Sequence, residues 1–181
     1  MQVLKHILQE LIDYWRFNMY MGNLKIYSFR ASIDSIGDIL NKVEDIKNDG
    51  EIIQLLNADA IYSFNHIIHG VNQALLAFKR GENLAKDIGV EILLRCSAQR
   101  QISIAFEMLG LKEDEMNLFV VLLNSDNHFE ELSSIFLYND EVHFANPLNF
   151  MELYEISSDE TKNMTIEEII IDRITKLTVD F

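Results

Sequence analysis

The feature that most constrains the fold is the alternation of short apolar runs with amphipathic helical stripes. Four runs have the length and the β-branched or aromatic content of strands: residues 24–29, 51–56, 90–96 and 118–123. The segments between them are too long for hairpins and show helical periodicity. We therefore expect an α+β two-layer sandwich with a mostly antiparallel or mixed four-stranded sheet covered by helices. The run at 90–96 is apolar on both faces, which predicts a central strand.

Helical spacing and capping residues predict the helices. They are expected at residues 36–46, from a cap at Ser63 to Gly81, in a short segment ending at Gly89, and at 99–109, 129–138, 150–156 and 166–177. Thr165 and Glu168 have the spacing of a capping box. In the 99–109 helix, the residues expected to face the core are Ile102, Ala105, Phe106 and Leu109.

The length of 181 residues favours a single domain over 1–181. Residues 1–20 form either a helical extension or an over-long gene start, and residues 157–181 are expected to hold an acidic C-terminal helix. The single cysteine, Cys96, excludes a disulfide framework and a cysteine-based zinc cage. The apolar runs are too short to span a membrane, so we expect a cytoplasmic protein.

The net charge of −14 is unevenly distributed along the chain. Residues 1–56 carry −2, residues 57–112 carry +1 and residues 113–181 carry −13. Because the charge of a whole chain says little about a local surface, a polyanion can still bind to the middle third.

Sequence motifs for catalysis are scarce. Neither glycine-rich phosphate loop, GxGxxG or GxxxxGK[ST], occurs, and the GxSxG elbow is missing. His66 and His69 have i, i+3 spacing, but no third metal ligand stands near them. We therefore expect no catalytic residue, no metal and no cofactor. A hydrolase using His66 or His69 remains the enzymatic alternative.

Cations and amides gather in the middle third. The candidate polyanion contacts are Lys79, Arg80, Lys86, Arg95, Ser97, Gln99, Arg100 and Gln101. Arginine and lysine suit phosphates, whereas glutamine and serine can reach base edges or ribose. The turn into the helix at Gln99 is expected to present free backbone N–H groups, which favour anions. The alternative interpretation is that these are ordinary loop and cap residues.

An ordered set of short motifs runs from Asn57 to Lys112. It comprises Asn57-Ala58, the helix from His66 to Phe78, Gly81-Glu82-Asn83, Glu91 to Leu94, and Ser97 with Arg100-Gln101-Ile102. In this order the motifs resemble the TPRKB-type, kinase-binding accessory subunit of the KEOPS complex. The resemblance covers about a third of the chain. Ala98 departs from it, because the family has glycine there, and the 1–20 segment has no clear counterpart.

This resemblance implies an α+β sandwich and a non-catalytic, regulatory subunit. Such a subunit binds and stimulates the small atypical kinase/ATPase of KEOPS. It also recruits tRNA through the 3′ CCA end, for threonylcarbamoyl modification of the adenosine next to the anticodon. His66 then joins the candidate RNA contacts, and the apolar pair Ile104 and Met108 is the expected kinase contact. The other alternative is a protein-interaction module without RNA binding.

Overall fold

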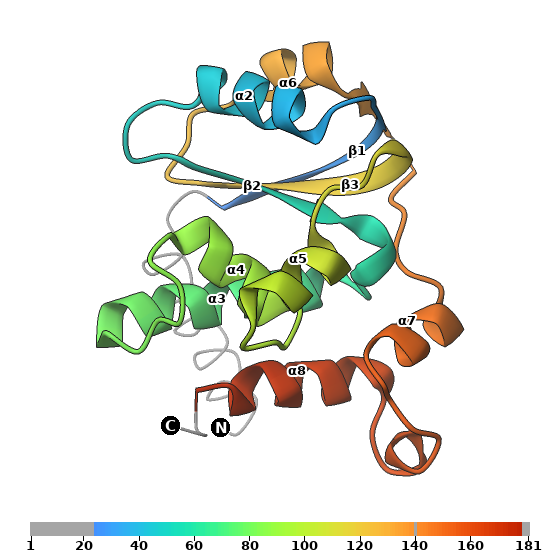
Figure 1. The fold of residues 1–181 in the computed structure, drawn as a ribbon. Helices are drawn as coiled ribbons and strands as arrows, with labels where there is room; N and C mark the ends of the chain where they lie inside the picture. Colours follow the sequence, from blue (N-terminus) through green and yellow to red (C-terminus); the bar gives the residue numbers. More distant parts are fainter. Residues whose placement is uncertain (1–23, 140, 179–181) are drawn as a thin grey trace, which may run out of the picture.

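The computed structural model describes residues 24–139 and 141–178, where a four-stranded sheet lies between two layers of helices (Figure 1). The strands are β1 (Lys25–Ile33), β2 (Ile52–Asn57), β3 (Asp114–Leu123) and β4 (Leu137–Tyr138). The helix expected within residues 1–20 falls outside the described residues.

The sheet has the order β2-β3-β1-β4, and every neighbouring pair is antiparallel. The long central strand β3 pairs with β1 from Lys25↔Leu122 to Ile33↔Asp114, and with β2 along its other edge. The two-residue strand β4 adds to the far side of β1, so β2 is the opposite edge strand. The predicted α+β sandwich with an antiparallel sheet is confirmed, but it has three layers where two were expected, because helices cover both faces of the sheet.

Two hydrophobic cores follow from the alternation of side chains along β3. Leu118, Val120 and Leu122 are buried on one face of the sheet, and Phe119 and Val121 on the other. Because consecutive side chains of a strand point to opposite faces, a strand buried on both sides is apolar throughout. The run at 118–123 therefore supplies the central strand that was expected at 90–96.

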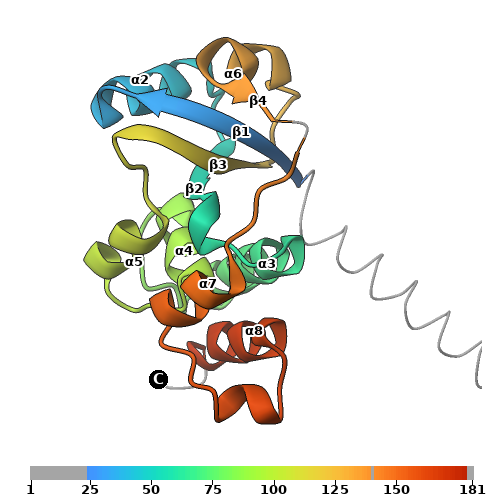
Figure 2. The ribbon, with the colours of Figure 1, turned by 90° about the vertical axis from the view of Figure 1, so that its right-hand side faces the viewer.

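Helices cover both faces of the sheet. The helices α2 (Ile36–Ile46) and α6 (Phe129–Ile135) form the upper layer in Figures 1 and 2. The lower layer contains α3 (Phe64–Arg80), α4 (Ile88–Cys96) and α5 (Ile102–Leu109). Below it lie α7 (Pro147–Leu153) and α8 (Ile166–Lys176), with α8 packed along α3. The short 3₁₀ helices are η1 (Ala58–Ala60) and η2 (Glu160–Lys162).

The expected strand at 90–96 is wrong, because this segment is the helix α4. Asp87 caps it by accepting a hydrogen bond from the Val90 N–H at 3.0 Å. The helix packs against α3, α5 and β2, so nearly all its faces are buried. A helix enclosed in this way exposes no polar face to solvent, and a short, mostly apolar run of this kind resembles a buried strand.

Other boundaries differ from the prediction by a few residues or in kind. The expected short helix ending at Gly89 is a loop, and the expected helix at 129–138 ends at Ile135, where β4 follows. The cap at Ser63, the left-handed Gly81 that ends α3, and the capping box of α8 are confirmed. No helix in the described part of the chain is long and apolar enough to cross a membrane.

Candidate functional site

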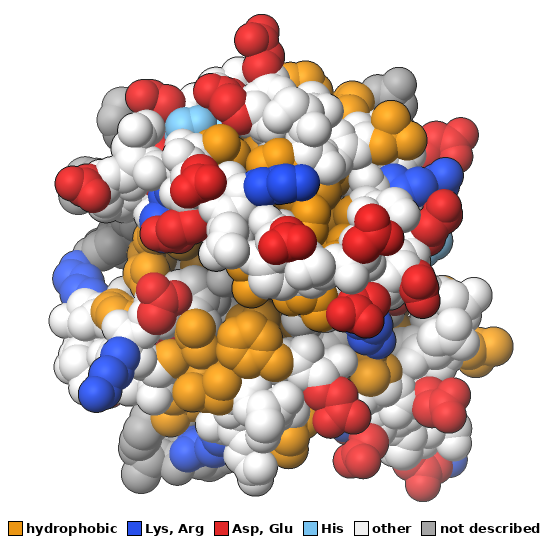
Figure 3. Space-filling model, turned by 45° about the horizontal axis from the view of Figure 1, so that its top comes forward, with side chains coloured by type: hydrophobic (Ala, Val, Ile, Leu, Met, Phe, Trp, Pro, Cys, Tyr) orange, Lys and Arg blue, Asp and Glu red, His pale blue; other side chains and the backbone are white. Residues whose placement is uncertain are grey.

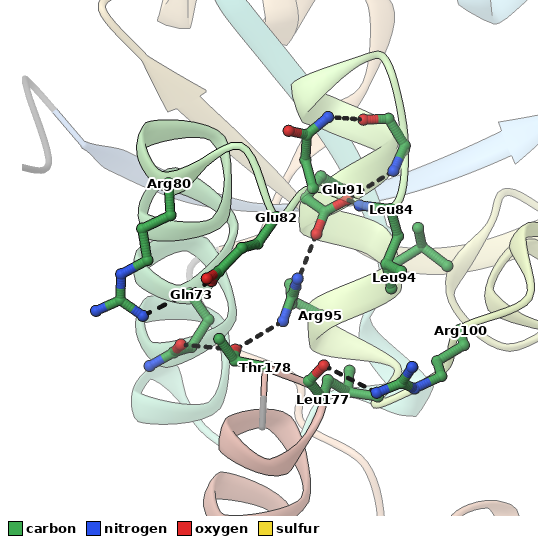
Figure 4. A network of polar contacts seen from close by, with 12 residues as sticks. Gln73, Arg80, Glu82, Leu84, Glu91, Leu94, Arg95, Arg100, Leu177 and Thr178 are labelled. Atoms are coloured by element: carbon green, nitrogen blue, oxygen red, sulfur yellow. Dashed lines mark hydrogen bonds and ion pairs between the residues drawn. The ribbon is translucent and has the colours of Figure 1, made fainter. Parts of the chain in front are cut away.

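Arg95, expected to contact phosphate, is fully buried between α3 and α4 (Figure 4). Its Nε donates a hydrogen bond to Glu91 Oε1 at 2.7 Å, and Nη1 donates to Thr178 Oγ1 at 2.9 Å. The other Glu91 oxygen accepts the backbone N–H groups of Leu84 and Ala85, each at 2.8 Å. The guanidinium therefore holds the loop after α3 and the end of α8 together, and the expectation that it contacts RNA is wrong for this fold.

His66 is also fully buried, and both ring nitrogens are engaged. Nδ1 accepts the Tyr62 N–H at 3.2 Å, so Nε2 carries the proton and donates to the Cys96 carbonyl at 2.6 Å. Burial lowers the pKa of His66 from 6.5 to about 4, which keeps the ring neutral at neutral pH. This histidine is therefore a structural residue, and its expected role in RNA binding is corrected.

Cys96 is likewise buried, and His69 is hydrogen-bonded. Burial raises the pKa of the Cys96 thiol to about 12, far above the range of a reactive cysteine. The half-buried His69 has Nε2 2.8 Å from Thr175 Oγ1, and burial lowers its pKa. Among residues 24–139 and 141–178, no three His, Cys, Asp or Glu side chains gather as a metal site requires.

Ser97 and Gln99 form the turn between α4 and α5 rather than an open anion site. Ser97 is buried and its hydroxyl donates to the Leu94 carbonyl at 3.0 Å, so it too leaves the set of RNA contacts. The backbone N–H of Gln99, expected to be free, donates to the same carbonyl at 3.0 Å. Between them Ala98 has a φ of 51°, the left-handed region that favours glycine. Glycine would therefore fit this backbone conformation with less strain than alanine.

Four of the expected cations are exposed. Lys79 and Arg80 end α3, Lys86 lies in the loop before α4, and Arg100 lies between α4 and α5. Arg100 donates to the Leu177 carbonyl at 3.1 Å, and Figure 4 shows Arg80 and Arg100 on the two sides of the buried Arg95. Gln99 is half-buried and Gln101 is exposed. The structure therefore leaves exposed cations at the loops before and after α4.

The helix α5 presents a different apolar face from the one expected. Ala105 and Leu109 are buried as predicted, but Ile102 and Phe106 are 46% and 48% exposed. Met108 is buried and Ile104 is half-buried, both against the core between the sheet and the lower helical layer, called the lower core below. Met108 is therefore no longer a candidate kinase contact. The sequence did indicate an exposed apolar face, because α5 has apolar residues at more positions than one buried stripe requires.

The acidic segments η2 and α8 lie against this region. The helix α8 packs along α3, and Ser63 donates a hydrogen bond to Glu167 across the two helices. Near the start of η2, Arg173 of α8 pairs with Glu160 at 2.7 Å. The acidic residues of η2 and α8 therefore lie below the lower helical layer, apart from the cations at the end of α3.

Comparison with known proteins gives two matches. The model of the family described as kinase binding protein CGI-121 matches residues 32–176. A curated relative, "Regulatory protein Cgi121" from Methanocaldococcus jannaschii, is 39% identical over 74 residues. These residues are 41% of this chain and 48% of the relative, so the matched region spans about half the length of that protein.

Proposed function

This chain belongs to the CGI-121 family of kinase-binding proteins, and from that premise we propose that it is the kinase-binding, regulatory subunit of a KEOPS complex. In this role it binds the small atypical kinase/ATPase of the complex and stimulates it. It also brings in tRNA by the 3′ CCA end for threonylcarbamoyl modification of adenosine next to the anticodon. The observation that carries the kinase-binding part is the family match, which runs from the end of β1 to the last turn of α8.

The state of the buried polar residues supports a regulatory rather than a catalytic role. His66 is neutral with both nitrogens engaged, and Cys96 is a buried thiol with a raised pKa. A general base or a nucleophile needs access to substrate and a pKa near the working pH. These two residues therefore support the hydrolase alternative poorly.

Exposed cations and amides support the RNA-binding part. Arg80 and Lys86 lie where α3 ends and the loop to α4 begins, and Gln101 is exposed at the start of α5. Unpaired nucleotides at a tRNA end can splay their bases toward such side chains, which a base-paired RNA helix does not allow. Lysine and arginine would contact phosphates, and the amide would read a base edge or a ribose hydroxyl.

Kinase turnover tests the regulatory role. The kinase subunit encoded by the same genome is assayed for ATP hydrolysis alone, with this chain, and with this chain denatured beforehand. We expect turnover to rise only with the folded chain, and this chain alone to hydrolyse no ATP. Turnover by the isolated chain that His69→Ala abolishes would instead support an enzyme.

A filter-binding titration with intact and CCA-trimmed tRNA tests the RNA-binding part. Lys86→Glu should weaken binding to intact tRNA and reduce the slope of log K against log salt by up to about 0.7 per lost contact. Lys42→Glu makes the same charge change on α2, in the upper helical layer, and should leave binding nearly unchanged. Equal binding of intact and trimmed tRNA, unaffected by Lys86→Glu, would leave a protein-interaction module without RNA binding.

A further inference from the structure

A groove of about 530 Å³ runs along the free edge of the sheet. Its upper wall is α2, its floor is the edge strand β2, and its lower wall is α5. Leu40, Ile53 and Phe106 line it from these three elements. Figure 3 shows this side of the molecule, where hydrophobic side chains gather in a hollow below the upper helical layer.

The groove carries large apolar side chains that the described residues leave uncovered. Leu40 is 51% exposed and Phe106 is 48% exposed, and Ile102 stands one helical turn before Phe106 on the same face of α5. The polar side chain on its floor is already engaged, since the Gln54 amide donates to the Leu55 carbonyl at 2.9 Å. A contiguous apolar hollow of this kind is typical of a protein-binding site.

Acidic side chains border the groove. Glu44 of α2 lines the groove and is exposed, and its Oε2 also pairs with Lys47 Nζ at 2.7 Å. Past Leu111, which lines the groove, the three acidic residues at 113–115 are exposed. Figure 3 shows acidic side chains along the upper edge of the hollow. A complementary partner therefore presents apolar side chains flanked by lysine or arginine.

This charge pattern disfavours a second copy of the chain as the occupant. Two copies that met across this groove would bring like-charged borders together, in a protein whose net charge is already −14. Like charges brought together across an interface cost free energy and suppress such pairings. A basic partner gains from the same border, both in the rate of encounter and in orientation.

We propose that the groove between α2, β2 and α5 is the surface on which this chain binds its kinase. The kinase inserts apolar side chains over Ile102, Phe106 and Leu40, and its basic residues face the acidic border. The proposal rests on the proposed kinase-binding function and adds the surface that carries it out. It also replaces Ile104 and Met108, which face the lower core, as the central contact.

Calorimetric titration of the kinase into the full chain tests this assignment. Phe106→Ser and Ile102→Ser should each weaken binding roughly tenfold or more, as loss of a buried anchor does. Leu148→Ser is the matched control, because Leu148 is 75% exposed on α7, outside the groove. Added salt should weaken binding of the kinase to the unaltered chain, since the border acts through charge.

The other outcomes distinguish a wrong surface from a wrong function and from another occupant of the groove. If the unaltered chain binds the kinase and both serine variants bind equally well, the groove is the wrong surface while the proposed function stands. If the unaltered chain does not bind the kinase at all, the proposed function itself fails. A dimer in sedimentation that Phe106→Ser dissociates would assign the groove to a second copy. Tighter kinase binding after removal of residues 1–23 would assign it to that segment, and either result would overturn the proposal.

Discussion

At the scale of single residues, the interior of the lower layer is held by polar side chains that have no exposure to solvent. Glu91, Arg95 and His66 each have 0% exposure. Glu91 and His66 are hydrogen-bonded to backbone groups. Arg95 bonds Glu91 within α4 and Thr178 across 83 positions, while its Nη2 has no hydrogen-bond partner among the described residues. Buried polar groups cost free energy unless they are bonded, so each of these residues makes stability depend on its partners.

The buried ion pair gives a prediction about stability. Arg95→Met leaves Glu91 without its cation, and Glu91→Gln leaves the Arg95 charge without its counter-ion. Each should lower the free energy of unfolding by about 3–5 kcal/mol. Chemical denaturation measures the loss, and the double variant Glu91→Gln/Arg95→Met should recover part of it. Little loss in either single variant would mean that the pair is not closed in solution.

His66 predicts a pH dependence. Its pKa is about 4 in the folded state against 6.5 as the ordinary value, so between these pH values the unfolded chain binds a proton that the folded chain does not. The contribution of this pKa difference to the free energy of unfolding is therefore full above pH 6.5, and it falls as the pH drops toward 4. The loss between pH 7 and pH 5 is about 2 kcal/mol. Urea unfolding at the two pH values measures this fall.

His66→Gln is the control for that pH dependence. Glutamine keeps a donor and an acceptor but does not titrate, so the variant should lose stability less steeply between pH 7 and pH 5. Some slope should remain, because burial also lowers the pKa of His69. An unchanged slope in the variant would show that another group titrates in this range.

At the scale of elements, sequence patterns predicted three of the four strands and most of the helices. The segments β1, β2 and β3 are recognisable by their short apolar runs, and α3 and α8 by their caps at Ser63 and Thr165. The helix α4 was mistaken for a strand because it is enclosed by α3, α5 and β2. The strand β4 has only two residues, too few for any alternation to be seen.

The candidate site was predictable only in part, for a related reason. Exposed cations such as Arg80 and Lys86 could be recognised by residue type and position in the chain. The burial of Arg95 depends on Thr178, a contact for which local spacing gives no signal. The exposure of Ile102 and Phe106 depends on which face of α5 meets the lower core, and this is decided by the packing of α4 and η1.

The close packing of α3 and α4 gives a prediction at this scale. A Cβ on Gly70 would lie 2.3 Å from Cys96 Sγ and 3.2 Å from the backbone of that residue. Gly70→Ala should therefore force the two helices apart and destabilise the fold by about 1–3 kcal/mol. Gly37→Ala in α2 is the control, since its Cβ meets only Ser35 Oγ at 3.9 Å, and it should stabilise the protein by about 0.5 kcal/mol. Equal melting temperatures for the two variants would contradict this packing argument.

At the scale of the whole molecule, the charges and apolar surfaces are separated by the layers of the fold. The acidic third supplies α8 below the lower helices, and the exposed cations cluster where α3 turns toward α4. The apolar groove with its acidic border lies along the β2 edge, between the upper layer and α5. A chain with a net charge of −14 can therefore present one surface suited to a basic protein and another suited to phosphate.

This separation predicts that the kinase and tRNA bind independently. Phe106→Ser should weaken kinase binding while the dissociation constant for intact tRNA stays within about twofold, and Lys86→Glu should do the reverse. The reason is that the two residues belong to different elements and that salt screens exposed charges beyond about 8 Å at physiological ionic strength. Titrating tRNA into the chain with and without saturating kinase measures any residual coupling, and circular dichroism confirms that both variants are folded. A variant that remains folded yet weakens both partners by the same factor would mean that one continuous surface serves both, joined at the start of α5, where Gln101 directly precedes Ile102.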